Sequence, residues 1–285
     1  MLSDNSKISR NDAYLSIVWS NTKSWGFYYR CKCSGLMTSL PTLLSISFWA
    51  KIPRRGQPID GIVRYGNAYF AFGDSANPTH NKTSLRFSTW QFRGLNPPYF
   101  MFRGRNTANT QITVDMGDVP EDCDLHWRHY VLTVDYSSTT WSLQLYIDGS
   151  LFSTGAVATG STAPFNYPNS YFIVGGGDAG SGTTAGVKYV DEYGLFNIIL
   201  PSNAIADIYN NGVPHDLEIS GPAGDYTQTS NLLNYWRMGD GAGDTIGTKL
   251  NDEKGSNDLD VHNESETGNI IEGEPALGGS SIGIQ

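Results

Sequence analysis

Acidic side chains are the first candidates for chemistry in this sequence, because glycoside hydrolysis needs two cooperating carboxyl groups. One known arrangement of such a pair on a single strand is an E-x-D-x-x-E pattern, and no such pattern occurs here. Asp191 and Glu192 are adjacent, so on a strand they point to opposite faces of the sheet. We therefore expect no catalytic residues. Asp191 should be buried and hydrogen-bonded, and Glu192 should lie on the surface.

The histidines and cysteines also give little indication of catalytic or metal-binding chemistry. His126 and His129 flank Trp127 and Arg128, but no nucleophile motif accompanies them, so structural or surface roles are expected. The three cysteines are Cys31, Cys33 and Cys123. Their odd number leaves a free thiol, and no second Cys/His pair stands at zinc-ligand spacing. We expect isolated reduced thiols and no zinc.

Sugar binding needs an exposed aromatic platform with polar neighbours. Trp90, Tyr99 and Phe100 lie close to Asn96 in the sequence, which makes these four residues the candidate ligand-binding set. The alternative is that the aromatic residues pack in a core or an interface.

The net charge of the chain limits the classes of partner that the protein can bind. The formal net charge of −9 argues against binding to nucleic acids or to an anionic membrane, because both require a basic surface. No apolar run is long enough to span a membrane. The segment from Met1 to Asp12 is polar, so we expect no signal peptide.

Many short strands joined by turns are expected to position these residues. In the segment 45–52, Ile46, Phe48, Ala50 and Ile52 share one face. A hairpin is predicted from strands over 128–136 and 141–148, and Asp148-Gly149 then turns the chain into a further strand. Trp141, Leu143, Leu145 and Ile147 should face the core. Further strands are expected over 61–65, 68–72, 84–90, 99–103, 171–175 and 187–196.

One short helix is predicted after Pro201, with Ser202 or Asn203 as its cap and Gly212 as its end. We divide the chain into an N-terminal arm over 1–42, a sandwich over 43–216 and a C-terminal extension over 217–285. The predicted fold is all-β: an antiparallel jelly-roll sandwich with one short helix and extended terminal arms.

Three ordered segments resemble the laminin-G-like, concanavalin A-like family. Ser45–Ile52 is similar to its S-I-S-x-W-x-K strand. The stretch Trp127–Val134, followed by Leu145–Gly149, is similar to its W-x-H-V…L-Y-V-D-G hairpin. Val190–Asn197, followed by Ile205–Gly212, resembles its closing segment. The usual opening strand, F-D-G-x-D-D-Y, has no counterpart in residues 1–42.

A fourth segment resembles virion proteins of tailed, often marine, bacteriophages. It runs from Leu233 to Gly241 as L-N-Y-W-R-M-G-D-G and continues from Asp252 to Leu259 as D-E-K-G-S-N-D-L. In the family such a segment opens the jelly roll, whereas here it follows the closing motif. The strand expected over 232–238 could return to its own sandwich, pair with a neighbouring subunit, or be the remnant of a truncated repeat.

The resemblance also implies a possible ion, because related domains hold calcium at the rim of the sandwich. Asp74, Asp178 and Asp191 are the candidate oxygen donors. The glycines of 175–180 could bend their carbonyl groups around the ion, or they could form a simple turn. No other cofactor is expected.

These observations predict a non-enzymatic virion protein that decorates a capsid or associates with a tail or fibre. We expect the protein on the outer surface of the particle, where it contacts other virion proteins. We also expect it to be a homo-oligomer, with host-surface glycans as a possible ligand. The alternative is a carbohydrate-binding module of a bacterial surface or exported protein, located at the cell surface or outside the cell. A polysaccharide hydrolase or lyase has almost no support from the residues.

Overall fold

The structure of the chain is a computed structural model. The structure describes residues 15–17, 28–32, 40–52, 64–74, 83–92, 97–123, 126–166, 170–174, 188–245, 249–262 and 270–272. Of the predicted arms, residues 1–14 and 273–285 lie outside these ranges.

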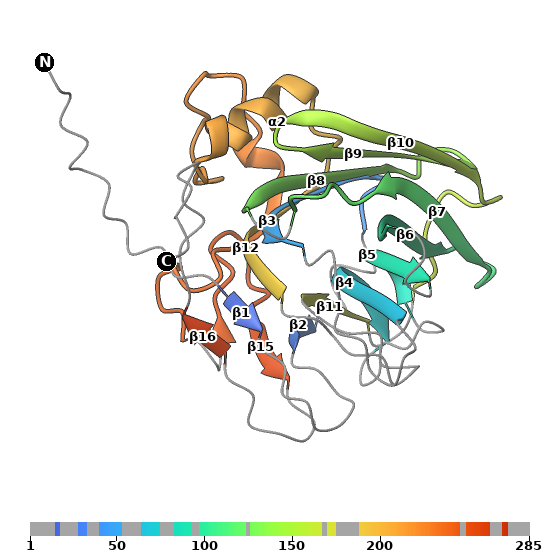
Figure 1. The fold of residues 1–285 in the computed structure, drawn as a ribbon, viewed down its shortest axis with the longest axis horizontal. Coiled ribbons are helices and arrows are strands. Elements are labelled where there is room, and N and C mark those ends of the chain that lie inside the picture. Colours follow the sequence, from blue (N-terminus) through green and yellow to red (C-terminus); the bar gives the residue numbers. More distant parts are fainter. Residues whose placement is uncertain are drawn as a thin grey trace, which may run out of the picture.

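Two antiparallel sheets make up the molecule (Figure 1). The first, sheet A, has the order β10 (Ser150–Ala158), β9 (Thr140–Ile147), β8 (Arg128–Asp135), β3 (Leu43–Lys51), β12 (Lys188–Phe196), β1 (Leu15–Ile17) and β16 (Ile270–Glu272), with β13 (Leu232–Trp236) also paired to β12. Sheet B has the order β14 (Lys249–Leu250), β15 (Leu259–His262), β2 (Tyr28–Lys32), β11 (Ser170–Val174), β4 (Arg64–Asp74), β5 (Thr83–Phe92), β6 (Tyr99–Arg105) and β7 (Gln111–Asp118).

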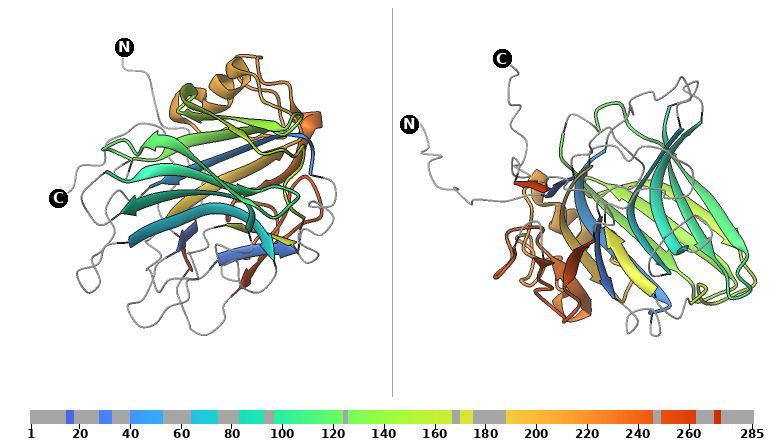
Figure 2. Two further views of the ribbon diagram at one scale, coloured as in Figure 1. Left: turned by 90° about the vertical axis from the view of Figure 1, so that its right-hand side faces the viewer. Right: turned by 90° about the horizontal axis from the view of Figure 1, so that it is seen from below.

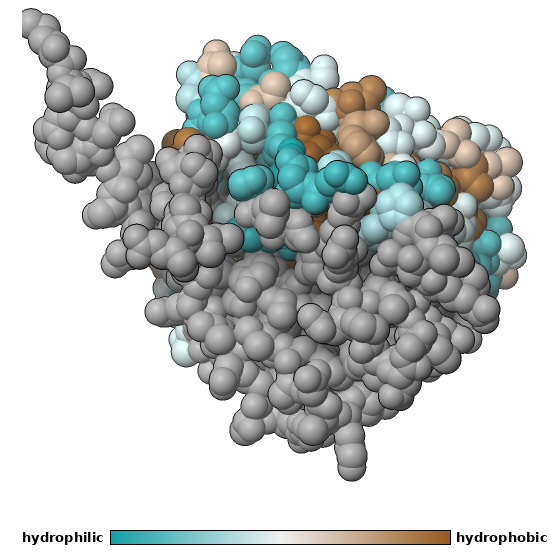
Figure 3. Space-filling view, viewed as in Figure 1, coloured by the Kyte–Doolittle hydropathy of each residue, from teal (hydrophilic) through white to brown (hydrophobic). Residues whose placement is uncertain are grey.

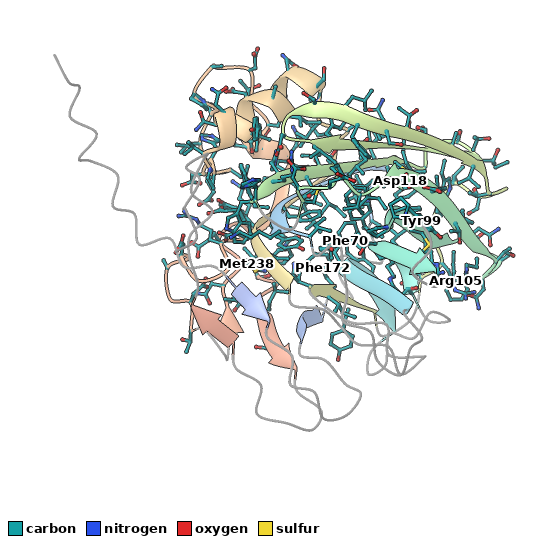
Figure 4. The ribbon with its side chains drawn as sticks, in the orientation of Figure 1. Phe70, Tyr99, Arg105, Asp118, Phe172 and Met238 are labelled. Atoms are coloured by element: carbon teal, nitrogen blue, oxygen red, sulfur yellow. The ribbon has the colours of Figure 1, made fainter. Side chains whose placement is uncertain are left out.

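The sheets pack face to face as a sandwich (Figure 2), which confirms the predicted fold class. Aromatic rings fill the space between them. Phe48 on β3 stacks on Tyr193 of β12, with ring centroids 5.0 Å apart, and on Tyr130 of β8, at 5.5 Å. Phe70 and Phe172 reach the same core from sheet B (Figure 4). Offset or edge-on ring packing of this kind adds to the free energy gained by burying the rings.

The predicted hairpin is present as β8 and β9. The side chains of Trp141, Leu143, Leu145 and Ile147 are buried in the core between the sheets, as expected from their alternation. The turn into β10 uses positive φ angles, 50° at Asp148 and 76° at Gly149. Asp and Gly tolerate this left-handed conformation, which matches the right-handed twist of a tight hairpin.

One α-helix, α2 (Ser202–Tyr209), occurs in the described residues, and it lies on the outer side of sheet A (Figure 1). Ile205 and Ile208 pack there against Val131 of β8 and Tyr146 of β9. The predicted cap was wrong: Pro201 is the N-cap residue and no side chain caps the helix. Proline fixes φ near −65°, which suits the start of a helix without a capping hydroxyl.

A buried aspartate on α2 holds the loop that follows the helix. The Asp207 carboxylate accepts hydrogen bonds from the backbone amides of Ala223, Asp225 and Tyr226 at 2.7 to 2.9 Å. These bonds lower the pKa of Asp207, although burial acts in the opposite direction. The loop and the helix therefore form one cover over the outer face of sheet A.

Both terminal regions contribute strands to the sandwich. β1 pairs with β12 and β16, while β2 lies between β11 and β15. β13 runs antiparallel to β12 of its own chain, with Tyr193 opposite Trp236. The Trp236 indole stacks on Phe172 of sheet B at 5.0 Å, so β13 helps to close the core. The three-part division of the chain remains a prediction.

The turn after β13 is organised by a second buried aspartate. The Asp252 carboxylate accepts hydrogen bonds from the amides of Tyr235, Gly255 and Asn257, each at 3.0 Å. A Cβ atom on Gly255 would lie 2.5 Å from the same carboxylate, so glycine is required there. The D-x-x-G-x-N stretch seen in the sequence is thus the motif of a carboxylate-centred turn.

Candidate functional site

The surface of β6 and β7 that faces away from the core carries the side chains best suited to bind a ligand. Alternation along β6 sends Phe100 and Phe102 into the core and leaves Tyr99, Arg103 and Arg105 on the other side. On β7, Gln111, Thr113 and Asp115 are exposed, whereas the three β6 side chains are half-buried. We call this set the β6–β7 face: Tyr99, Arg103, Arg105, Gln111, Thr113 and Asp115.

Positive charge on this face comes from the register of the strands. Arg103 lies directly opposite Arg86 of β5 on one side and Thr113 of β7 on the other. Like charges placed opposite each other destabilise a strand pair. Arg86 is buried and Arg103 is half-buried, and both arginines interact with neighbouring groups.

Neighbouring contacts hold the other β6 arginine in place. The Arg105 guanidinium donates hydrogen bonds to the backbone carbonyl of Asn109 at 2.7 Å and to its side-chain oxygen at 3.2 Å. Asn109 has a left-handed φ of 63°, which turns the β6–β7 hairpin back towards the arginine. Figure 4 shows Arg105 and Tyr99 at opposite ends of β6, with Asp118 on β7 near Tyr99.

Charges of both signs act on Tyr99. Partial burial and the nearby Asp115 carboxylate raise the pKa of the Tyr99 phenol, and Arg103 opposes them. Asp115 is itself fixed, because one of its carboxylate oxygens accepts a hydrogen bond from the Gly117 amide at 2.8 Å. An aromatic ring on the same face as a guanidinium and a carboxylate offers stacking, donor and acceptor groups to a hydroxyl-rich ligand.

The structure describes three of the four residues predicted to bind sugar, and it brings two of them together. Trp90 of β5 pairs with Tyr99 in the backbone register, so these two positions are neighbours. Asn96 lies outside the described residues. Phe100 was a wrong choice, because its side chain is fully buried and stacks on Phe87 at 5.6 Å. The alternation that sends Tyr99 outward sends Phe100 into the core.

The arginines were missed in the sequence because no motif surrounds them. Their signal was the alternation of Y-F-M-F-R-G-R, which puts Arg103 and Arg105 on the face of Tyr99. This alternation identifies a binding face only when β5 and β7 are known to be the neighbours of β6 in the sheet.

The predicted calcium ligands are only partly visible. Asp178 lies outside the described residues, and of Asp74 only the backbone is described. Asp191 is buried, and its carboxylate accepts a hydrogen bond from the Glu192 amide at 2.9 Å. Among the side chains that the structure describes, no three acidic, cysteine or histidine residues form a group that could hold a metal. Calcium binding remains a prediction.

The expected surface position of Glu192 was wrong, because this side chain is buried. An irregularity in the β12–β3 pairing follows Asp191, and Glu192 takes a φ of 51°, so simple alternation fails there. The Glu192 carboxylate accepts a hydrogen bond from the Tyr235 hydroxyl and lies 3.3 Å from the Arg237 guanidinium. Burial raises the pKa of Glu192 to about 7, although Arg237 and Tyr235 oppose this effect.

The histidines have the structural roles expected of them. His129 is buried on the outer side of sheet A, where its Nε2 lies 2.8 Å from the Ser47 hydroxyl and its ring packs on Trp49. Burial lowers its pKa to about 3, so the ring is neutral near pH 7. His126 is exposed, and Cys123 is a buried thiol.

Comparison with known families agrees with this architecture. A family model described as the concanavalin A-like lectin/glucanases superfamily matches residues 34–206. The chain belongs to this superfamily. A search of curated proteins finds no match. Among the described residues, no helix is long and apolar enough to cross a membrane.

A search of solved structures finds similar chains at low sequence identity. A native heptameric SAP-like pentraxin from Limulus polyphemus is 11% identical, with a TM-score of 0.43 over 70% of this chain and 82% of that chain. The CBM40 of the Ruminococcus gnavus IT-sialidase is 13% identical, with a TM-score of 0.40 over 66% and 94%. Tailspike protein 2 of Escherichia coli O157:H7 bacteriophage CAB120 is 13% identical, with a TM-score of 0.41 over 70% of this chain but 24% of that chain.

Proposed function

We propose that this chain is a non-enzymatic glycan-binding module whose binding surface is the β6–β7 face. The observation that carries the proposal is that Tyr99, Arg103 and Asp115 lie on one face, which strands, rather than loops, hold in position. Membership of a lectin and glucanase superfamily supports it. Guanidinium groups pair well with carboxylates, so sugars that bear a carboxylate are the favoured ligand class.

Binding is favoured over hydrolysis by the location of the acidic groups. A glycosidase needs an accessible acid and a second carboxylate on opposite sides of the scissile bond. Glu192 has a pKa of about 7, but it is buried beneath Tyr235 and Arg237 on another strand pair. The E-x-D-x-x-E pattern is also missing from the sequence.

Titration calorimetry with oligosaccharides tests the proposal. We expect carboxylate-bearing oligosaccharides to bind the parent chain, and carboxyl-reduced forms of the same sugars to bind more weakly. Tyr99→Ala and Arg103→Gln should each weaken binding at least about tenfold. Thr154→Ala, an exposed change on β10, is the matched control and should leave the affinity unchanged. Binding that survives both face variants would refute the assignment.

A virion protein of a tailed bacteriophage is the second candidate function. It is supported by the resemblance of the segment from Leu233 to Leu259 to phage virion proteins, and the acidic chain suits the outside of a particle better than contact with packaged DNA. In that setting the glycan would belong to the host surface, and other virion proteins would be partners. A module of a bacterial surface or exported protein is the alternative setting. Mass spectrometry of purified particles should detect the chain, and its consistent absence would reject the virion assignment.

A further inference from the structure

At its Arg105 end, the β6–β7 face continues onto a segment that is distant in the sequence. Asn106 forms an antiparallel bridge with Pro164, and the Phe165 amide donates a hydrogen bond to the Arg105 carbonyl at 2.8 Å. Residues directly opposite each other in an antiparallel pair share one side of the sheet. Arg105 therefore has Gln111 of β7 on one side and Phe165 on the other, with all three side chains facing away from the core. We call these three residues the Arg105 subsite.

Hydrogen bonds hold the loop that carries Phe165 against the β6–β7 hairpin. The Asn106 side chain donates a hydrogen bond to the Thr159 carbonyl at 2.8 Å. The Ser161 carbonyl accepts one from the indole of the core residue Trp141 at 2.6 Å. Because the loop is fixed at both points, the subsite is assembled before a ligand binds, which lowers the entropic cost of binding.

The Arg105 guanidinium is held by neutral groups. Arg128 lies against two aspartates and Arg237 against a glutamate. Arg105 instead donates through Nη1 to the backbone and side-chain oxygens of Asn109, and no carboxylate among the described residues pairs with it. Its other terminal nitrogen, Nη2, has no hydrogen-bond partner within the same ranges. A guanidinium fixed in this way keeps its charge and its donors for an anionic group.

The two ends of the β6–β7 face also differ in charge. Asp118 is directly opposite Tyr99 in the strand register, and Asp115 lies on the same strand. At the other end, the segments 106–111 and 159–166 contain no charged residue. The right-hand part of Figure 3, where β7 and β10 lie, shows hydrophilic and apolar residues side by side. An incoming carboxylate is therefore repelled at the Tyr99 end and attracted at the Arg105 end.

We propose that the Arg105 subsite binds the carboxylate-bearing unit of the glycan. Arg105 and Gln111 donate hydrogen bonds to the carboxylate, and the Phe165 ring packs on the apolar face of the sugar ring. Asn109 is a positioning residue that fixes the guanidinium. The proposal rests on the proposed function and gives the ligand a direction along β6, with its carboxylate at Arg105 and its hydroxyl groups towards Tyr99. Hexuronates and sialic acids share this chemistry.

Titration calorimetry with two pairs of probes tests the subsite: trigalacturonate and 3′-sialyllactose, each compared with its own methyl ester. The parent should bind at least one of the acids at least about tenfold more tightly than its ester. Asn109→Asp places a carboxylate beside Arg105, so this preference should disappear. The matched control is Asn211→Asp, which changes an exposed asparagine of similar backbone conformation, with φ of 54°, beside the end of α2. It should keep the preference, although both variants change the net charge from −9 to −10.

Two further variants separate the roles within the subsite. Arg105→Gln should also remove the preference for the acid, which covers the case that Asn109→Asp fails to fold. Phe165→Leu keeps an apolar side chain but removes the ring, so it should weaken the acid and the ester by the same factor and leave their ratio unchanged.

The outcomes distinguish this proposal from the proposed function. Tyr99→Ala should weaken the acid and the ester equally. If sugars bind but the preference for the acid is missing from the parent, or survives in both Asn109→Asp and Arg105→Gln, the subsite is wrong while the β6–β7 face can still bind glycans. If no probe binds the parent, the proposed function fails and the subsite fails with it.

Discussion

At the residue scale, the most unusual group is the buried Glu192 carboxyl. It joins β12 to β13 and to the residue after it, since Tyr235 of β13 and the following Arg237 both contact it. Its pKa of about 7 lies above the ordinary value of 4.5. Between these two values the folded state holds the proton more tightly than the unfolded state does. Its contribution to stability therefore decreases as the pH rises through this window.

Glu192→Gln tests that linkage. The parent should lose more stability than the variant between about pH 5 and about pH 8, by roughly 1–3 kcal/mol, because glutamine does not titrate. Urea unfolding at a series of pH values measures the difference. If the parent and the variant show the same pH dependence, Glu192 titrates normally and the burial argument is wrong.

Leu145 provides a residue-scale test of the core. Its side chain is fully buried between the sheets, and Leu145→Ala should lower the free energy of unfolding by about 2–5 kcal/mol. Ser142→Ala, on an exposed position of the same strand, should change it by less than about 0.5 kcal/mol. Denaturant melts measure both values. Equal effects would show that β9 has the opposite register.

At the element scale, long strands with alternating apolar residues could be predicted from the sequence, and short strands could not. β9 could be predicted with its core-facing side chains, because apolar residues occupy every second position from Trp141 to Ile147. β1 and β2 could not be placed, since their partners lie more than a hundred residues away and short strands have no periodicity of their own. Glu192 was misplaced because a local irregularity breaks the alternation on which the prediction depended.

The turn after β13 makes an element-scale prediction. Asp252→Ala should lower the free energy of unfolding by roughly 2–4 kcal/mol, because several buried backbone amides lose their acceptor. Asp260→Ala, an exposed aspartate on the neighbouring β15, is the control and should have little effect. Thermal melts compare the two variants. A stable Asp252→Ala protein would mean that β13 is held by its apolar side chains alone.

At the scale of the whole molecule, the two sheets differ in what their surfaces present. The outer side of sheet A is covered near β8 and β9 by α2 and ends at the neutral edge of β10. Sheet B presents the half-buried Arg103 and Arg105 of β6 within a chain of net charge −9. The fold class and the superfamily could be predicted from alternation and motifs. The β6–β7 face could not be predicted, because its side chains come from two strands whose pairing cannot be derived from the sequence.

The central claim is that the β6–β7 face binds a glycan, and hydrogen–deuterium exchange with and without a carboxylate-bearing oligosaccharide tests it most directly. Amides of β6 and β7 between Tyr99 and Asp118 should exchange more slowly in the presence of the sugar, while those of β9 and β10 should not change. Protection that appears elsewhere in the sandwich but not on β6 and β7 would contradict the account.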